Sequence, residues 1–337
     1  PLTGVTLQIL NKKLDGGNIL LKSYSSTSPF SISKNRKNIY KKSIVYLPRK
    51  VKELYNRGEV SFFKDVNKLN NKPNFYNSQL YKTPKNIEFA IGLFSIYSKW
   101  LNKKIRNIFF NEQWIVLFKF DNLNKMSNTL YNFRRITPPK DRIWADPFIW
   151  KKDGLSYLFI EEMITKENKG KISVMKLNKN GTYDPPQIII EENYHLSYPF
   201  LIEENNELYM IPESGINKTI NLYKCLEFPH KWEFVKFIMK DIQAVDSTVF
   251  YYNNKYWLFA NVRQQPKTSI HEELFLFFSE SLIDDIWVSH PKNPIVTDIR
   301  CSRPAGNIFV KEKKIYRPSQ NCAKRYGHSM SIQEILV

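Results

Sequence analysis

The chain has 337 residues, a formal net charge of +19 and three cysteines. The cysteines, Cys225, Cys301 and Cys322, form no C-x-x-C pair, and the five histidines form no H-x-x-x-H or H-E-x-x-H motif. This pattern argues against a disulfide scaffold and a structural zinc, fits a reducing compartment, and predicts no metal site. The N-terminal residues do not show a signal-peptide pattern.

The positive charge is concentrated in the first part of the chain. Residues 1–140 hold 26 Lys and Arg against 7 Asp and Glu, a net of +19, whereas residues 141–337 hold 25 of each kind, a net of zero. Such a segment favours an anionic partner such as nucleic acid, acidic lipid headgroups or a phosphorylated carrier lipid. The abundance of Asn, Lys and Ile, as an AT-rich genome would produce, explains the basic charge equally well.

The first 120 residues predict a few strands and helices in chain order. Residues 3–23 alternate in polarity around a tight turn and predict two strands. A helix is predicted over 35–56, where Pro48 would break or kink it. Residues 86–110 predict an amphipathic helix with a basic C-terminal end, which either packs on the protein, the favoured interpretation, or lies on a membrane surface. Its apolar stretch is too short to span a bilayer, and 111–120 predicts another strand.

The second half of the chain repeats one pattern four times: a short strand, a polar turn, and a strand that begins with tyrosine. The copies lie at 144–162, 197–214, 245–262 and 302–321, and their opening residues are 52, 48 and 57 positions apart. A period near fifty built of hairpins is typical of a β-propeller with one blade per repeat. We therefore predict four consecutive blades in 144–337, with hairpin turns at 153–154, 205–206, 253–254 and 311–314. The strand at 111–120 would complete the last blade.

Residues that face each other across these hairpins can be paired by counting from the turns. The predicted pairs are Asp146 with Glu161, Tyr198 with Glu213, Asp246 with Asn261, and Arg303 with Gln320. Because the innermost strands of all blades run alike around a central channel, we expect these eight side chains at one rim. Carboxylates and amides bind sugar hydroxyls, and two carboxylates can divide acid and base roles at a glycosidic bond. The alternative is that these polar residues only cap strand ends and hydrate the channel.

Two of these acids stand out. Asp146 and Glu213 each adjoin a proline, Pro147 or Pro212, and an apolar stretch that should bury the strand. A buried carboxylate is unfavourable unless it has a partner or a chemical role. The predicted partners are Arg303 and Arg317, and a purely structural ion-pair network is the alternative.

Six segments carry a resemblance to a known family. WADPF, YLFIEE, MIPESG, AVDSTVF, SRPAGNIF and YRPSQNCAKRYGHSMSI occur in order and resemble the N-terminal propeller domain of the glucosamine inositolphosphorylceramide transferase family, over roughly 110–337. That domain is similar in fold to the five-bladed furanosidase propellers of glycoside hydrolase family 43. The resemblance implies a mainly β, five-bladed β-propeller whose last blade is incomplete in this chain, preceded by a basic helical segment.

The furanosidase pattern also implies roles for individual residues. It implies a base at Asp146, a second Asp at Asp246, and an acid Glu on a further blade. The fourth copy opens with Arg303 instead, so that the acid is missing or is replaced by Glu213. This departure argues against simple glycoside hydrolysis.

The N-terminal end resembles a different family. TGVTLQILNKKLDGGNIL at 3–20 is similar to the end of the catalytic domain of formyltransferases of the methionyl-tRNA and sugar-nucleotide type. The resemblance implies that Asp15 assists formyl transfer, and that the Asn and His partners and the site for a formyl-folate donor lie upstream of Pro1. No cofactor is then expected within this chain. The predicted domains are a formyltransferase-like tail (1–25), a basic, partly helical linker (26–110) and the propeller (111–337).

The predicted function is carbohydrate-active: sugar transfer or modification in surface-glycan biosynthesis, linked to an upstream formyltransferase, in a cytoplasmic protein that is peripheral to the inner face of the membrane. The alternatives are a non-catalytic glycan- or carrier-binding module and a furanoside hydrolase. The predicted partners are a carbohydrate, nucleotide-sugar or lipid-linked sugar and, through residues 1–110, an anionic membrane surface; nucleic acid is not expected. The predicted catalytic residues are Asp146, Glu213 and Asp246, and the predicted substrate-binding residues are Glu161, Tyr198, Asn261, Arg303, Arg317 and Gln320.

Overall fold

The computed structural model describes residues 2–12, 16–71, 82–110, 113–120, 129–283 and 286–336. The chain divides into two compact units, Pro1–Glu112 and Gln113–Val337, and each is described here by itself. Asp15, the residue singled out by the formyltransferase resemblance, lies outside the described residues.

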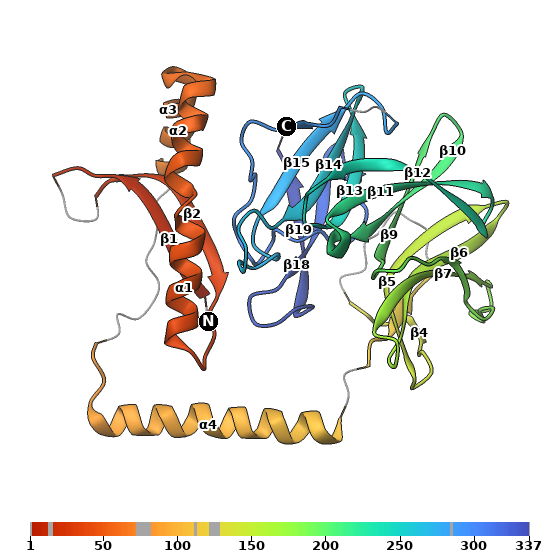
Figure 1. The fold of residues 1–337 in the computed structure, drawn as a ribbon, viewed down its shortest axis with the longest axis horizontal. Coiled ribbons are helices and arrows are strands. Elements are labelled where there is room, and N and C mark those ends of the chain that lie inside the picture. The colour runs from red at the N-terminus through yellow and green to blue at the C-terminus, as the bar shows by residue number, and fades with distance from the viewer. Residues whose placement is uncertain are drawn as a thin grey trace. The chain divides into compact units, whose positions relative to one another are not determined.

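The first unit combines a hairpin with helices (Figure 1). Strands β1 (Leu2–Ile9) and β2 (Asn18–Ser26) are antiparallel, and helices α1 (Ile32–Ser43), α2 (Tyr46–Arg57) and α3 (Glu59–Asn70) follow. Ser31 caps α1 by accepting the Lys34 N–H. The helix predicted over 35–56 is broken before Pro48, which lies in the first turn of α2, where a proline is tolerated. Asn70 on α3 exchanges two hydrogen bonds with the backbone of Ile19 on β2, at 2.9 and 3.0 Å.

Helix α4 (Asn86–Phe109) has 24 residues, none of which is buried. Its limits confirm the helix predicted over 86–110. No helix in the described part of the chain is both long enough and apolar enough to cross a membrane.

The second unit is built from small antiparallel sheets (Figure 1). A two-stranded sheet joins β3 (Val116–Phe118) and β4 (Arg134–Ile136). Blade 1 holds β5 (Arg142–Lys152), β6 (Leu155–Ile164), β7 (Lys169–Leu177) and β8 (Gln187–Ile190). Blade 2 holds β9 (Ser197–Glu204), β10 (Glu207–Ser214), β11 (Thr219–Glu227) and β12 (Lys231–Lys240), with a 3-10 turn, η1, at Gly215–Asn217. Blade 3 holds β13 (Ala244–Tyr252), β14 (Lys255–Val262), β15 (Leu274–Ser279) and β16 (Val288–Ser289). Blade 4 holds β17 (Phe309–Lys311), β18 (Lys314–Asn321) and β19 (Ser329–Ile335).

The described residues therefore form a mainly β propeller arrangement of four blades, with helices in the N-terminal unit. The fifth blade implied by the family resemblance is not among them. The strand at 111–120 was predicted to complete the last blade, but β3 instead pairs with β4.

All four predicted hairpin turns are confirmed. Both central residues have a positive φ in every case: Asp153 and Gly154 (51° and 73°), Asn205 and Asn206 (53° and 63°), Asn253 and Asn254 (50° and 56°), and Glu312 and Lys313 (51° and 62°). This is the type I′ geometry, whose twist matches that of the flanking strands. Asn, Asp and Gly adopt a positive φ readily, which explains why three of the turns were plain in the sequence.

The blades pack face to face through apolar side chains. One buried cluster takes Phe159 and Ile172 from blade 1, Met210 from blade 2 and Leu258 from blade 3. A separate cluster, which includes Phe259, Leu274, Ile308 and Ile315, joins blade 3 to blade 4. These contacts hold the inner strands at fixed positions, so that residues from different blades can share one cavity.

Candidate functional site

The first strands of blades 1, 2 and 3 share an irregularity at the position where the sequence predicts the site. Each contains a β-bulge, and the residue in the bulge has a left-handed backbone: φ is 46° for Asp146, 46° for Tyr198 and 53° for Asp246. Aspartate tolerates this conformation because its short side chain bonds locally, whereas it is uncommon for tyrosine. The same bulge, with a residue in the left-handed conformation, thus recurs in three successive blades.

The bulges correct the predicted pairing by one residue. The observed pairs are Ala145 with Glu161, Ser197 with Glu213, and Val245 with Asn261. The bulge adds one residue to the first strand of the blade. Pairs that are counted from the turn are therefore wrong by one residue beyond the bulge. In blade 4 the Gln320 N–H donates to the Arg303 carbonyl at 2.8 Å, as the predicted pair requires, although the pairing shifts by two residues between Phe309–Tyr316 and Pro304–Ser319.

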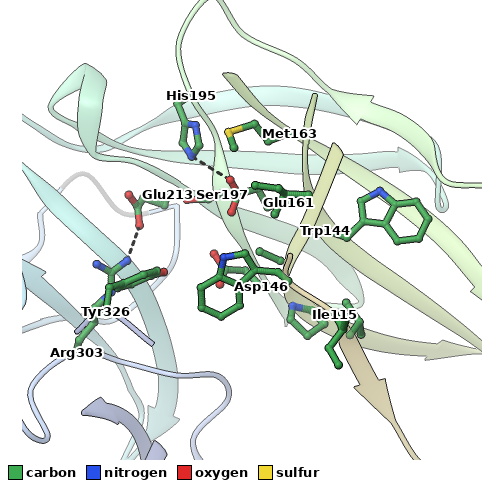
Figure 2. Close-up of a pocket in the computed structure, with 15 residues that line it drawn as sticks. Ile115, Trp144, Asp146, Glu161, Met163, His195, Ser197, Glu213, Arg303 and Tyr326 are labelled. Carbon is green, nitrogen blue, oxygen red and sulfur yellow. Dashed lines mark ion pairs between the residues drawn. The ribbon is translucent and has the colours of Figure 1, made fainter. Parts of the chain in front are cut away.

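A cavity of about 460 Å³ is lined by four of the predicted residues: Asp146, Glu161, Glu213 and Arg303. Figure 2 shows these side chains around the cavity together with His195 and Tyr326. Trp114 and Trp144 also line it, and Trp114 meets the ring of Tyr326 edge to face with centroids 6.0 Å apart. The cavity thus brings together acids from blades 1 and 2, a cation from blade 4, and aromatic rings.

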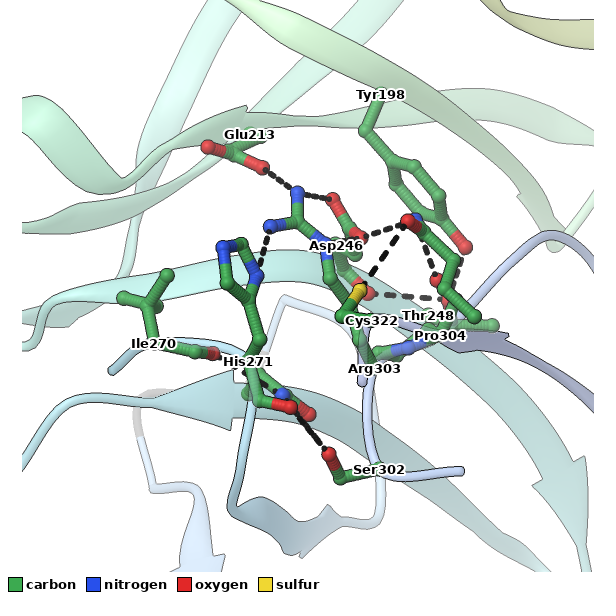
Figure 3. Close-up of polar contacts among 12 residues, drawn as sticks. Tyr198, Glu213, Asp246, Thr248, Ile270, His271, Ser302, Arg303, Pro304 and Cys322 are labelled. Atoms are coloured by element: carbon green, nitrogen blue, oxygen red, sulfur yellow. Dashed lines mark hydrogen bonds and ion pairs between the residues drawn. The ribbon is translucent and has the colours of Figure 1, made fainter. Parts of the chain in front are cut away.

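Arg303 is the centre of the polar network (Figure 3). Its Nη2 donates to Asp246 Oδ1 at 3.0 Å and its Nε donates to Oδ2 of the same carboxylate at 2.5 Å. Nη2 also lies 3.6 Å from Glu213 Oε2, and the guanidinium lies 4.8 Å from the centroid of the Tyr326 ring. A fork of this kind fixes the orientation of both groups.

Asp246 lies behind Arg303 and does not line the cavity. The residue is fully buried, and Oδ2 accepts a further hydrogen bond from Gln320 Nε2 at 3.1 Å. Its charge is therefore met by Arg303 and Gln320, and the structure offers it no surface for contact with a ligand.

Asp146 and Glu213 bind protons more tightly than ordinary carboxyl groups do. Burial raises the pKa of Asp146 to about 8, and the neighbouring Asp246 and Glu161 add to this rise while Arg303 opposes it. Burial also raises the pKa of Glu213 well above its usual 4.5, and Asp246 adds to that shift. At neutral pH most Asp146 side chains therefore hold their proton. A carboxyl that is protonated at neutral pH can act as a general acid, whereas the furanosidase resemblance implied a base at Asp146.

Glu161 is held by a histidine that the sequence did not reveal. His195 Nε2 lies 3.2 Å from Glu161 Oε1, and the Gly170 N–H donates to His195 Nδ1 at 3.0 Å. Because Nδ1 accepts a hydrogen bond, the neutral ring carries its proton on Nε2 and donates it to Glu161. Gly170 is required at this contact, since a Cβ atom there would lie 2.8 Å from His195 Cε1.

A second histidine, His271, was also missed. Arg303 Nη1 donates to its Nδ1 at 2.8 Å, and burial, together with the charge of Arg303, lowers the pKa of His271 to about 4. The ring is therefore neutral at physiological pH. His195 precedes the second copy by two residues, whereas His271 lies outside all four copies in a connecting segment, so the repeat pattern gave no sign of it.

A second cavity of about 360 Å³ adjoins the first and shares Trp114, Asp146, Pro147 and Tyr326 with it. Tyr198 and Gln320 line this second cavity. The Tyr198 hydroxyl forms a hydrogen bond with Thr248 Oγ1 at 2.8 Å and accepts the Gly306 N–H at 2.9 Å, so it joins blades 2, 3 and 4.

Two predicted residues lie elsewhere and contact backbone. Asn261 is fully buried and donates to the Ile270 carbonyl at 3.1 Å. Arg317 was predicted to pair with a carboxylate, but it donates to the carbonyls of Ser302 (3.1 Å) and Cys301 (2.6 Å). Burial lowers the pKa of Arg317 to about 10. Among the described residues, no group of three or more His, Cys, Asp and Glu side chains is placed to hold a metal ion.

The chain is similar to curated plant proteins over its propeller. It is 33% identical over 196 residues to glucosamine inositolphosphorylceramide transferase 1 of Arabidopsis thaliana, covering 57% of this chain and 25% of that protein. It is 32% identical over 194 residues to the protein of the same name from Oryza sativa subsp. japonica, covering 57% and 26%. The chain thus spans about a quarter of the length of these relatives.

Solved structures with a similar chain trace include the RS223 β-xylosidase, with a TM-score of 0.47, 13% identity, and coverage of 60% of this chain and 77% of that chain. Another is the α-L-arabinanase of Cellvibrio cellulosa in complex with arabinohexaose, with a TM-score of 0.42, 15% identity, and coverage of 57% and 73%. Residues 135–337 match the family model described as glucosamine inositolphosphorylceramide transferase 1, N-terminal, and the chain therefore belongs to this family.

Proposed function

We propose that the larger cavity binds a sugar and that the propeller takes part in sugar transfer or modification during the synthesis of a surface glycan. One observation carries this proposal: acids from two blades meet an arginine and aromatic rings in one cavity, and the pKa values of two of those acids, Asp146 and Glu213, are raised. Carboxyl groups and arginine bind sugar hydroxyls in pairs, and aromatic rings cover the apolar faces of sugars.

An amino sugar suits this lining. The cavity holds three acidic side chains and one cation, and that cation is already paired with Asp246 behind it. Glu213 lines the cavity, and its buried Oε2 lies 3.6 Å from Arg303 Nη2, which leaves the other carboxyl oxygen for a ligand. The names of the curated relatives contain glucosamine, whose amine can donate hydrogen bonds to carboxyl oxygens whether or not the carboxyl holds a proton.

The residues divide into distinct roles in the proposed reaction. Asp146 donates its proton to the leaving oxygen as the glycosidic bond breaks, and Glu161, oriented by His195, accepts the proton of the attacking hydroxyl. Glu213 and Arg303 hold the sugar. Asp246 acts as a positioning residue, because its contact is with Arg303 rather than with the cavity.

The second candidate is a non-catalytic module that binds a glycan or a lipid-linked carrier. The burial of Asp246 favours it, because one of the two aspartates expected of a furanosidase is fully engaged by Arg303 and Gln320. The same observation counts against furanoside hydrolysis. The link to a formyltransferase and the cytoplasmic location stay predictions.

The test is to measure binding and turnover separately in Asp146→Asn and Glu213→Gln variants, with Glu227→Gln on an exposed strand end as the matched control. Calorimetric titrations would use glucosamine and N-acetylglucosamine, both free and nucleotide-linked. For an enzyme, we expect Asp146→Asn to lose turnover with binding largely kept; for a binding module, only affinity falls. If the unmodified chain binds none of these sugars, or if all three variants bind as it does, the proposal is wrong.

A further inference from the structure

Helix α4 presents an apolar face that the other elements of its own unit leave uncovered. None of its 24 residues is buried, and large apolar side chains are exposed along its whole length: Ile87, Phe89, Ile91, Leu93, Phe94, Tyr97, Trp100, Leu101, Ile105, Ile108 and Phe109. In a soluble protein such a contiguous surface marks an interaction site.

The apolar residues form two adjoining stripes at helical spacing. One stripe includes Ile87, Ile91, Phe94, Leu101 and Ile105, at steps of four, three, seven and four. The other, which includes Phe89, Leu93 and Trp100, runs beside it. Because a helix repeats every 3.6 residues, the two stripes together cover about half of its circumference. A coiled-coil partner would bury one narrow seam, so this wider face matches immersion in a lipid surface better.

The opposite face is basic. Lys99, Lys103 and Arg106 lie there with Ser95 and Asn102, and Glu88 is the one acid among the 24 residues of the helix. With Lys104, the helix holds four cations against one anion, a net of +3. Among the described residues no ion pair neutralises these four cations. A basic polar face opposite an apolar one fits a bilayer with acidic headgroups. The basic face attracts the headgroups, and the apolar face gains by burial among the acyl chains.

Lys104 and Trp100 meet at the apolar side. The Lys104 amine lies 4.4 Å from the centroid of the Trp100 ring. Both side chains have an apolar body and a polar end, so they can bury the body while the end reaches the headgroups. Such a pair is suited to the headgroup level of a membrane, where tryptophan rings are enriched.

We propose that α4 lies in the plane of a bilayer that contains anionic lipids and holds the protein at that surface. The proposal does not depend on the function of the cavity. Lipid is the expected occupant, because the broad apolar face matches the acyl region and the basic face matches acidic headgroups. No helix in the described part of the chain could span the bilayer, so α4 would bind at its surface.

The experiment is sedimentation of the full chain with vesicles of phosphatidylcholine, alone or mixed with phosphatidylserine. Two variants share the same introduced residue: Phe94→Gln with Leu101→Gln on the apolar face, and Ser95→Gln with Asn102→Gln on the polar face. We expect the apolar pair to weaken binding about tenfold or more, because two large side chains lose their burial, and the polar pair to bind as the unmodified chain does. Unchanged melting of both variants shows that the rest of the fold is intact.

Two further variants of α4 test the role of its basic residues and the depth of Trp100 in the bilayer. Removing two charges, Lys103→Gln with Arg106→Gln, should weaken binding to the mixed vesicles about thirtyfold and leave binding to pure phosphatidylcholine unchanged. Brominated lipids should quench fluorescence in the unmodified chain and quench it less in Trp100→Phe. The proposal is overturned if mixed vesicles fail to bind the chain at low salt, or if both glutamine pairs bind equally. A concentration-dependent dimer that the apolar pair abolishes, without vesicle binding, would assign the face to a second copy instead.

Discussion

Blades 1, 2 and 3 differ from blade 4 at the rim of the cavity, and the difference determines the chemistry there. The first three inner strands contain a bulge and place Asp146, Tyr198 or Asp246 in a left-handed conformation. In blade 4 the ladder of β17 ends at Phe309, an isolated bridge joins Pro304 to Ser319, and Arg303 lies beside that bridge. Blades 1 to 3 supply acids and a tyrosine, and blade 4 supplies the cation that neutralises one of the acids. Arg303 only partly opposes the rise in the pKa values of Asp146 and Glu213, which burial and the neighbouring Asp246 cause.

The first prediction removes the cation of blade 4. Arg303→Met should destabilise the fold by about 3–5 kcal/mol, because it leaves the buried Asp246 without its partner. Adding Asp246→Leu should recover part of this loss, since the two effects are coupled through one ion pair. Chemical denaturation of the single and double variants measures both values.

The control for that prediction is Arg300→Met. Arg300 pairs with Asp298 at 2.6 Å, but its side chain is 45% exposed, and we expect a change of about 0.5 kcal/mol or less. If Arg303→Met were as mild as this control, the ion pair would not link blades 3 and 4 as described.

The second prediction tests the bulged tyrosine. Tyr198→Phe removes a hydroxyl that bonds with Thr248 and accepts the Gly306 N–H, and leaves both groups without that partner. We expect a loss of about 1–3 kcal/mol in the free energy of unfolding. Tyr251→Phe, on an exposed side chain whose hydroxyl makes a 3.5 Å contact with Asn254, should change it by less than about 0.5 kcal/mol. Equal effects would show that the Tyr198 hydroxyl does not join the blades.

The third prediction isolates the backbone of a bulge. At Asp146, glycine should be more stable than alanine by roughly 1 kcal/mol, because alanine is strained at a φ of 46°. At Ser329, in the regular strand β19, the order should reverse, with glycine less stable by roughly 0.5–1 kcal/mol. The same order at both positions would argue that the bulge carries no strain.

Much of the fold could be predicted because the signals are local. The turns at 153–154, 205–206 and 253–254 carry Asp, Gly or Asn, and the repeated strand–turn–strand pattern needs no distant contact to be recognised. The rim residues of blades 1 and 2 could be named for the same reason, since counting back from a turn reaches them within about ten residues.

The remaining details depend on contacts between distant segments. Nothing in the local sequence distinguishes a bulged strand from a regular one, so the pairs at Glu161, Glu213 and Asn261 were wrong by one residue. His195 and His271 lie on segments that connect strands. The lengths of these segments do not predict which residues of the site they contact. Arg317 looked like a partner for a carboxylate, but the path of 301–302 places two backbone carbonyls in front of it.

The bulge of blade 1 places Asp146 in the cavity, where this acid is protonated at neutral pH. The most direct measurement is the free energy of unfolding of the unmodified chain and of Asp146→Asn as a function of pH. Because the folded-state pKa of Asp146 is raised from 3.8 to about 8, the folded chain binds more protons than the unfolded chain in that range. The contribution of this group is therefore fully present below about pH 3.8 and is lost as the pH rises through about 8. We expect the unmodified chain to lose stability relative to Asp146→Asn across this range; parallel curves, or a relative gain in stability with rising pH, would show that Asp146 does not hold its proton at neutral pH.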